Sequence, residues 1–474
     1  MLKCAYVSKG ELHSRIRRSL IIMKKNLTFK ETFLVGITLF GMFFGAGNLI
    51  FPVHLGQLAG SNTWPAIIGF IVTAVSIPIL GVASIGNTHS DNLLCLGQKV
   101  SGWYGIVFTT MLYLTIGPFF AIPRCCTTSF TTGFASLIPE SSQRIMLFMF
   151  SLVFFAIVLF FSLRPSGITT WVGKVITPIF LVFLAILIVV AMSNPAAKIA
   201  EIEPTESYVN GAFFNGFVEG YGTMDAIAGL AFGIVIINVV RGFGITEDNA
   251  VARETVKAGI ITAVLMAIIY VLTTIMGTQS RGLFEVSDNG GIALSQISGH
   301  YLGTVGTIIL ALTITFACLK TAIGLVISCS EMFVAMFPQS LSYKGWAIAF
   351  SVFSFAVSNV GLTAIINYSV PVLMLLYPLA ITLIILALTE KWFNKSKYVY
   401  IWTTVGAFIA AVFDFAKTLP EGIQTALNIP AMTELGAKVF PLFDISLGWI
   451  VPALIGCIIG LIVTKFKKSE QIAQ

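Results

Sequence analysis

Charged residues are scarce in this chain. Only 10% of its 474 residues are Asp, Glu, Lys or Arg, whereas soluble domains carry about 25%. Hydrophobic residues make up 57%, and apolar runs of roughly 20 residues, long enough to cross a bilayer as a helix, recur along the sequence. This composition excludes a soluble globular protein and indicates a polytopic all-α membrane protein.

Residues suited to metal binding, disulfides and catalysis are also few. The four histidines are scattered, and the seven cysteines lack the spacing of metal ligands. We therefore expect no metal site and no cofactor, and no constellation of His, Asp and Ser indicates an enzyme. The first 22 residues are basic but lack the apolar core of a signal peptide. We interpret residues 1–22 as an upstream extension with no role in the fold.

The apolar runs predict about twelve transmembrane helices. Lys and Arg concentrate in alternate connecting segments, and such residues favour the cytoplasmic side of a membrane. Both termini are therefore predicted to be cytoplasmic, as the segments 1–31 and 465–474. This topology also accounts for the net charge of +7, so nucleic acid is not implied as a partner, and the oligomeric state stays open.

Weak internal similarity divides the chain into two repeats. The string SGWYG at 101–105 resembles SGHYLG at 298–303, and further matches follow in the same order. The first five spans (32–193) thus correspond to the second five (210–390), and helices 11 and 12 (398–464) lie outside the repeat. A second copy of an odd number of spans enters the membrane from the opposite side. Inverted repeats of this kind are typical of secondary transporters.

The first span of each repeat is interrupted by small and polar residues. One break is Gly45-Ala46-Gly47-Asn48, and the other is Gly220-Tyr221-Gly222-Thr223-Met224-Asp225. Irregular backbone survives at membrane depth only where protein or a watery cavity satisfies its polar groups. Freed amides suit a carboxylate, and freed carbonyls suit an ammonium group or a cation. We predict a site for a zwitterion between the breaks, with close helix packing as the alternative interpretation.

Some charged residues lie inside the predicted spans, where a charge is a functional candidate by default. They are Arg124, Glu219, Asp225, Lys320, Glu331 and Asp414. We interpret Glu331 and Asp414, near the ends of their spans, as interfacial. Glu219 and Asp225 flank the second break and are expected to cap half-helices or to pair with Arg124.

Several strings carry a resemblance to a known family. FFGAGNLIFPVHLGQLAG (43–60), GPFFAIPR (117–124), EGYGTMDAIAGLAFG (219–233) and FACLKTAIGL (316–325) resemble the bacterial branched-chain amino acid:cation symporters, the BrnQ-type carriers. The resemblance implies symport of leucine, isoleucine and valine with a proton or sodium ion across the bacterial cytoplasmic membrane. It also implies the five-plus-five inverted-repeat fold of the wider superfamily, with broken helices 1 and 6.

The resemblance further implies the residues of the site. The substrate carboxylate would bind the amides of Ala46 and Gly47, and its ammonium the carbonyls around Phe44 and Tyr221. The implied substrate-binding set is Phe44, Gly45, Ala46, Gly47, Asn48, Tyr221, Gly222 and Thr223, and the implied cation-coupling set is Gly41, Phe44, Ala317, Lys320 and Thr321. Lys320 stands where sodium-coupled relatives have a hydroxyl residue, which favours a proton as the coupled ion. Sodium symport and, less favoured, a channel or uniporter are the alternatives.

Overall fold

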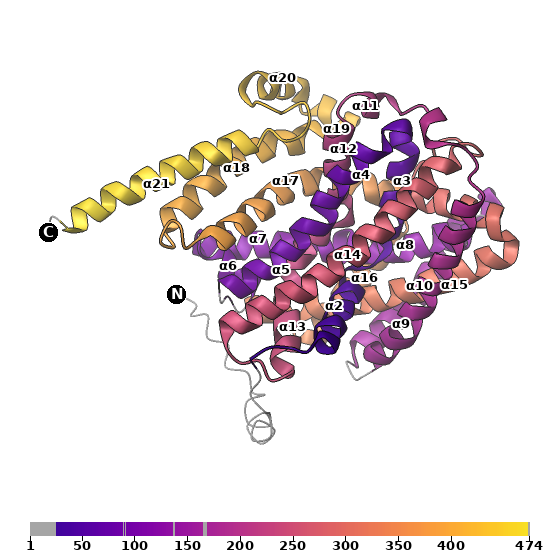
Figure 1. Cartoon of the computed structure of the whole chain (residues 1–474), viewed down its shortest axis with the longest axis horizontal. Helices are drawn as coiled ribbons and strands as arrows, with labels where there is room; N and C mark the ends of the chain where they lie inside the picture. Colours follow the sequence, from indigo (N-terminus) through magenta and orange to yellow (C-terminus); the bar gives the residue numbers. More distant parts are fainter. Residues whose placement is uncertain (1–24, 89, 91, 136–137, 165–167, 473–474) are drawn as a thin grey trace.

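The computed structural model describes residues 25–88, 90, 92–135, 138–164 and 168–472, and all regular structure within these ranges is helical (Figure 1). The longer helices are α2 (Phe29–Phe43), α3 (Ala46–Ala59), α4 (Thr63–Ile71), α5 (Ile77–Asn87), α7 (Gly102–Leu114), α8 (Ala121–Gly133), α9 (Glu140–Ser162), α10 (Ile168–Ser193), α12 (Ala212–Glu219), α13 (Asp225–Gly242), α14 (Asp248–Ser280), α15 (Gly290–Met336), α16 (Tyr343–Ser358), α17 (Leu362–Thr389), α18 (Lys397–Lys417), α20 (Ile429–Val439) and α21 (Ile450–Ile472). Short helices and turns join them: η1 (Gly60–Asn62), η2 (Val72–Ser76), α6 (Leu93–Gly97), η3 (Thr115–Phe119), η5 (Ile199–Glu201), α11 (Glu206–Val209), η6 (Gly220–Thr223) and α19 (Glu421–Ala426).

The helices are those of a multi-pass membrane protein. In the described part of the chain, eight helical segments are long and apolar enough to cross a membrane, and a pair bent by 47° at residue 234 makes a ninth. Helices α3 to α5 run on as one apolar segment, Gly47–Asn87, within the first predicted repeat. Helix α16, a predicted span, has only 16 residues. The total of twelve spans therefore stays a prediction.

The first predicted break is confirmed. Helix α2 begins at a capping box between Thr28 and Glu31, ends at Phe43, and is followed by extended backbone at Phe44 (φ −70°, ψ 101°). Helix α3 starts at Ala46, and the side-chain oxygen of Asn48 accepts a hydrogen bond from the Gly45 amide at 2.9 Å. The asparagine after the glycines therefore satisfies one of the amides that the break frees.

The second predicted break is confirmed as well. Helix α12 ends at Glu219 and is followed by the tight turn η6, Gly220–Thr223. Met224 then adopts a left-handed conformation (φ 64°), and α13 begins at Asp225. The Thr223 hydroxyl donates to the Gly220 carbonyl at 2.9 Å, which satisfies one of the carbonyls left at the end of α12.

A third interruption lies between α7 and α8, and the sequence analysis did not predict it. Gly117 departs from helical geometry (φ −98°, ψ −123°), and Pro118 follows it inside η3. Proline has no amide to donate and clashes with the preceding turn, so a Gly-Pro pair is a helix-breaking signal. The kink sets the start of α8, which carries Arg124.

The two broken helices pack against equivalent partners. Helices α2 and α3 lie against α14, whereas α12 and α13 lie against α4 and α5. Glycines bring these backbones together, since a Cβ on Gly56 would lie 2.0 Å from the Thr274 carbonyl oxygen and one on Gly216 would lie 2.0 Å from that of Ala66. The broken helix of the first repeat thus packs on α14 of the second repeat, and the broken helix of the second packs on α4 and α5 of the first. This exchange is the symmetry that a repeat of five spans requires.

The C-terminal helices α18 and α21 form a pair at one edge of the molecule and contact the rest through α17 (Figure 1). Their backbones also touch through glycines, because a Cβ on Gly406 would lie 2.2 Å from the Pro452 carbonyl oxygen. Asp414 on α18 is only 1% exposed. Asp414 is therefore buried by the protein, whereas Glu331 is exposed, and the interpretation of both as interfacial stays a prediction.

Candidate functional site

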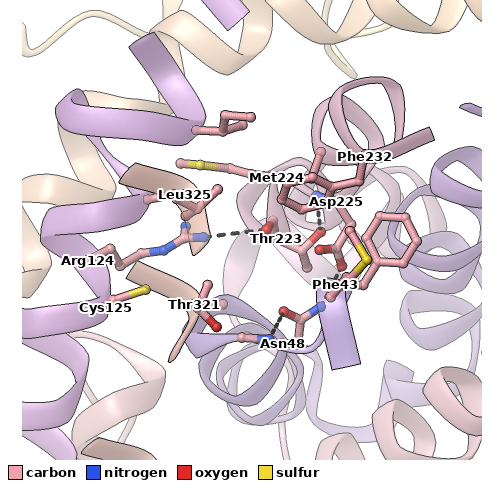
Figure 2. Close-up of a pocket in the computed structure, with 16 residues that line it drawn as sticks. Phe43, Asn48, Arg124, Cys125, Thr223, Met224, Asp225, Phe232, Thr321 and Leu325 are labelled. Atoms are coloured by element: carbon pink, nitrogen blue, oxygen red, sulfur yellow. Dashed lines mark hydrogen bonds between the residues drawn. The ribbon is translucent and has the colours of Figure 1, made fainter. Parts of the chain in front are cut away.

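A cavity lies where the two breaks meet (Figure 2). Its volume is about 50 Å³, below the roughly 300–1,000 Å³ typical of small-ligand pockets, so a ligand the size of leucine requires it to widen. The breaks supply Gly45, Gly47, Asn48, Thr223 and Asp225 to its wall. Most of the remaining lining is apolar, from Met42, Phe43, Ile116, Ala121, Met224, Ala228, Phe232 and Leu325. The cavity therefore combines polar backbone at the breaks with an apolar wall.

Arg124 reaches the second break from α8. Its Nη1 donates to the Gly222 carbonyl at 2.6 Å and its Nη2 to the Thr223 carbonyl at 3.4 Å. The guanidinium, 3% exposed, also lies 5.3 Å from the centroid of the Phe51 ring. A permanent cation thus holds the carbonyls that the break frees. The expected pairing of Arg124 with Glu219 or Asp225 is not among the ion pairs of the described residues.

Gly47 gives Arg124 the space for this approach. A Cβ on Gly47 would lie 2.8 Å from Nη2 of Arg124 and 3.4 Å from the Cα of Thr223. Contacts below 3.0 Å do not occur for real Cβ atoms, so any side chain at Gly47 would displace the guanidinium. The absence of a side chain at Gly47 in the first break therefore lets Arg124 bind the carbonyls of the second break.

Asp225 is the second buried charge at the cavity. It is 3% exposed, and its Oδ2 accepts hydrogen bonds from Asn48 Nδ2 at 2.5 Å and from the Tyr270 hydroxyl at 3.2 Å. Asn48 Nδ2 also donates to the Tyr270 hydroxyl at 2.5 Å. These bonds join α3, α13 and α14, so they link the break of one repeat to the break of the other. As expected, the carboxylate also lies in the first turn of α13, where the helix dipole favours a negative charge.

Comparison with known proteins decides the family. Residues 28–467 match the family model described as branched-chain amino acid transport protein. Over 434 residues the chain is 49% identical to the branched-chain amino acid permease BrnQ of Lactobacillus delbrueckii subsp. lactis, covering 91% of this chain and 96% of that protein. The chain belongs to this family. The BrnQ permease of Bacillus subtilis (strain 168) is 40% identical over 445 residues, with 94% and 99% of the two chains covered.

Solved structures give the fold. The nucleobase–cation symport family transporter Mhp1, in a closed conformation with bromovinylhydantoin bound, matches with a TM-score of 0.58 and 10% identity over 92% of each chain. MhsT in complex with L-phenylalanine matches with a TM-score of 0.55 and 14% identity, over 92% of this chain and 100% of that one. These likenesses confirm the five-plus-five inverted-repeat fold with two broken helices.

The residues predicted for the substrate divide between two cavities. Gly45, Gly47, Asn48 and Thr223 line the cavity at the breaks. Tyr221 and Gly222 instead line a second cavity of about 220 Å³, together with polar residues that include His54 and Glu219. The Tyr221 ring stacks on Tyr377 with centroids 4.1 Å apart, and its carbonyl accepts the Met224 amide at 3.0 Å. Phe44 is buried beside Phe40, and Ala46 begins α3.

The residues predicted for the cation lie between α2 and α15. Lys320 Nζ donates to the Gly41 carbonyl at 3.3 Å. Thr321 lines the cavity, and its hydroxyl donates to the Ala317 carbonyl at 3.1 Å. The structure thus places Lys320, one turn beyond Ala317 on α15, against the last turns of α2.

Two of the charged side chains singled out as functional candidates inside the predicted spans line the cavity. Arg124 and Asp225 were recognised as charged residues inside spans, but their positions at the cavity depend on contacts across about 100 and 177 residues of chain, Arg124 to Gly222 and Asp225 to Asn48. The resemblance pointed to backbone groups only. The rule that an intramembrane charge is a functional candidate singled out these residues, but it names neither their partners nor the cavity that they line.

Proposed function

We propose that the chain is a secondary active symporter that imports leucine, isoleucine and valine across the bacterial cytoplasmic membrane, with a proton favoured over sodium as the coupled ion. Both termini would be cytoplasmic, and no cofactor would be needed. The observation that carries the proposal is the cavity at the two breaks, which combines groups for both ends of a zwitterion with an apolar wall.

The lining of the cavity suits an aliphatic amino acid. Ile116, Ala228, Phe232 and Leu325 offer apolar surface, and burying each CH₂ group of a ligand there favours binding by about 0.8 kcal/mol. The relatives are named branched-chain amino acid permeases, which supports the same substrate class. In this proposal the first-turn amides of α3, at Ala46 and Gly47, bind the substrate carboxylate.

Lys320 is the basis for the coupled ion. Its ammonium donates to the Gly41 carbonyl, an oxygen that would otherwise be available to a metal cation. A lysine in this place carries a positive charge when protonated and none when deprotonated, so one proton would change the charge beside the first break. An arginine could not act in this way, because it does not lose its proton in proteins.

The test is uptake of radiolabelled leucine into liposomes that contain the purified protein. A proton gradient, imposed in sodium-free buffer, should drive accumulation above the external concentration, and unlabelled isoleucine or valine should compete. Collapse of the gradient with a protonophore should abolish accumulation, and liposomes without the protein are the control.

Other outcomes would identify the alternatives. Accumulation that requires sodium and ignores the proton gradient would replace the proton mechanism with sodium symport. Equilibration without accumulation under either gradient would indicate a uniporter or channel. Absence of uptake of all three amino acids would overturn the substrate assignment.

A further inference from the structure

The cavity at the breaks carries one side chain of each charge. Among the described residues that line it, Arg124 and Asp225 are the charged ones, and each is 3% exposed. The rest of the lining is neutral, so the formal charges of the wall cancel. A wall of this kind matches a ligand that itself carries one positive and one negative group.

Arg124 still has donors to offer. Two of its five N–H groups are used by the carbonyls of Gly222 and Thr223. Its Nε is buried and has no hydrogen-bond partner among the described residues. An unsatisfied charged donor in a buried site is costly, and a carboxylate is the partner that a guanidinium binds best.

Asp225 has an oxygen to offer in the same way. The hydrogen bonds that it accepts from Asn48 and Tyr270 end on Oδ2, and the Thr223 hydroxyl is a further hydrogen-bonding neighbour of the carboxylate. Each carboxylate oxygen has two lone pairs, so Oδ1 can still accept from an ammonium group in the cavity. In Figure 2 the side chains of Arg124 and Asp225 come from different walls, with Thr223 between them.

We propose that Arg124 and Asp225 recognise the two charges of the substrate directly, Arg124 its carboxylate and Asp225 its ammonium group. The proposal rests on the proposed function and adds two side chains to a site that the resemblance builds from backbone alone. It also gives the basis for selecting amino acids over uncharged or singly charged solutes. A ligand that lacks either charge leaves a buried, unpaired charge in the wall, which is strongly unfavourable.

A purely structural role for Arg124 makes a different prediction. If the arginine only clamps the carbonyls of Gly222 and Thr223, its removal distorts the cavity and weakens all ligands alike. The two roles are separated by varying the ligand together with the residue, because only groups in direct contact show coupling.

The experiment measures displacement of radiolabelled leucine from the purified protein by leucinamide, which lacks the carboxylate, and by 4-methylpentanoate, which lacks the ammonium group. The variants are Arg124→Gln, Arg124→Lys and Asp225→Asn. Arg281→Gln is the matched control, since Arg281 also donates to a backbone carbonyl, that of Gln57 at 2.9 Å, but outside the cavity.

For the parent protein and for the Arg281 variant we expect leucinamide to bind about tenfold or more weakly than leucine. In Arg124→Gln the difference should shrink to about twofold, the scatter of independent effects. The parent should likewise bind 4-methylpentanoate more weakly than leucine. Asp225→Asn should abolish this difference in affinity and leave the difference between leucinamide and leucine unchanged. Arg124→Lys, which keeps the charge, should retain part of the difference for leucinamide.

If the affinity differences between leucine and its two analogues are the same in the parent, in Arg124→Gln and in Asp225→Asn, the inference is wrong, whereas the proposed function still stands. If Arg124→Gln cannot be purified in folded form, the Asp225→Asn and Arg124→Lys arms decide the matter on their own. If the parent binds a different amino acid in place of the branched-chain ones, the proposed function is wrong. The same cycle with that amino acid and its amide then tests the two side chains.

Discussion

Replacement of Gly47 tests whether the two breaks depend on each other. Gly47→Ala adds one carbon, 2.8 Å from Arg124 Nη2, in a place where the guanidinium is held by two carbonyls. To relieve the contact the guanidinium must move and weaken at least one of these bonds, each worth about 1.5–3 kcal/mol for a charged donor. The alanine in turn favours the helix over glycine by up to about 1 kcal/mol, the value for a helix interior, although Gly47 lies in the first turn of α3.

The lost hydrogen bond and the gain in helix propensity change the free energy of unfolding in opposite directions. Only the displacement of Arg124 affects the binding site. We expect the thermal stability of Gly47→Ala to change by no more than about 2 kcal/mol, because the helix gain offsets much of the loss. Leucine affinity should fall about tenfold, because the displaced guanidinium no longer faces the cavity. Gly47→Leu should abolish binding, since its larger side chain also fills the cavity.

The assay is equilibrium binding of radiolabelled leucine, with thermal unfolding of the same purified samples. Gly324→Ala is the control, because a Cβ at Gly324 on α15 would meet no atom within 4 Å. Undiminished leucine binding by a folded Gly47→Ala protein would refute the idea that this glycine exists to admit Arg124.

Three further expectations concern other parts of the molecule. Lys320→Ala should remove proton-driven accumulation of leucine in liposomes but leave downhill exchange partly intact; undiminished accumulation would exclude Lys320 as the coupling group. Gly56→Ala should separate α3 from α14 and lower the free energy of unfolding by about 1–3 kcal/mol or more, measured by thermal unfolding against Gly324→Ala; an unchanged midpoint would contradict the packing. Glu390 is 1% exposed and accepts a bond from Lys99 Nζ at 2.6 Å, so Glu390→Gln should lower stability by about 1–3 kcal/mol in the same assay, and a raised midpoint would show that burial of this charge dominates.

Much of the fold follows from local sequence signals. The breaks at Gly45 and Gly220 were predicted because glycine next to polar residues inside an apolar run conflicts with an unbroken transmembrane helix. The kink at Gly117 carries an equally local signal, its following proline, but the sequence analysis did not use it. Local rules therefore explain where helices stop.

The side-chain contacts of the site do not follow from such rules. The bond from Asn48 to Asp225 joins residues 177 positions apart, and nothing in either segment names the other. The same holds for Asp414, whose position near a span end does not reveal that the packed helices bury its side chain. One sequence constrains periodicity and breaks, whereas the pairing of distant polar groups depends on how the helices pack.

The close glycine contacts between helices bear on how this transport protein moves. Helices α3 and α14 meet backbone to backbone at Gly56, and α4 and α12 do so at Gly216. Neither pair can slide past its partner without driving side chains into backbone, so each pair must travel as a single rigid part. Between the broken helices and α8, by contrast, the cavity separates the elements, and the hydrogen bonds from Arg124 to the carbonyls of η6 connect them. If α8 and the second break move apart at this cavity, either these hydrogen bonds break or Arg124 moves together with the break. The strength of these bonds therefore limits how easily the two sides separate.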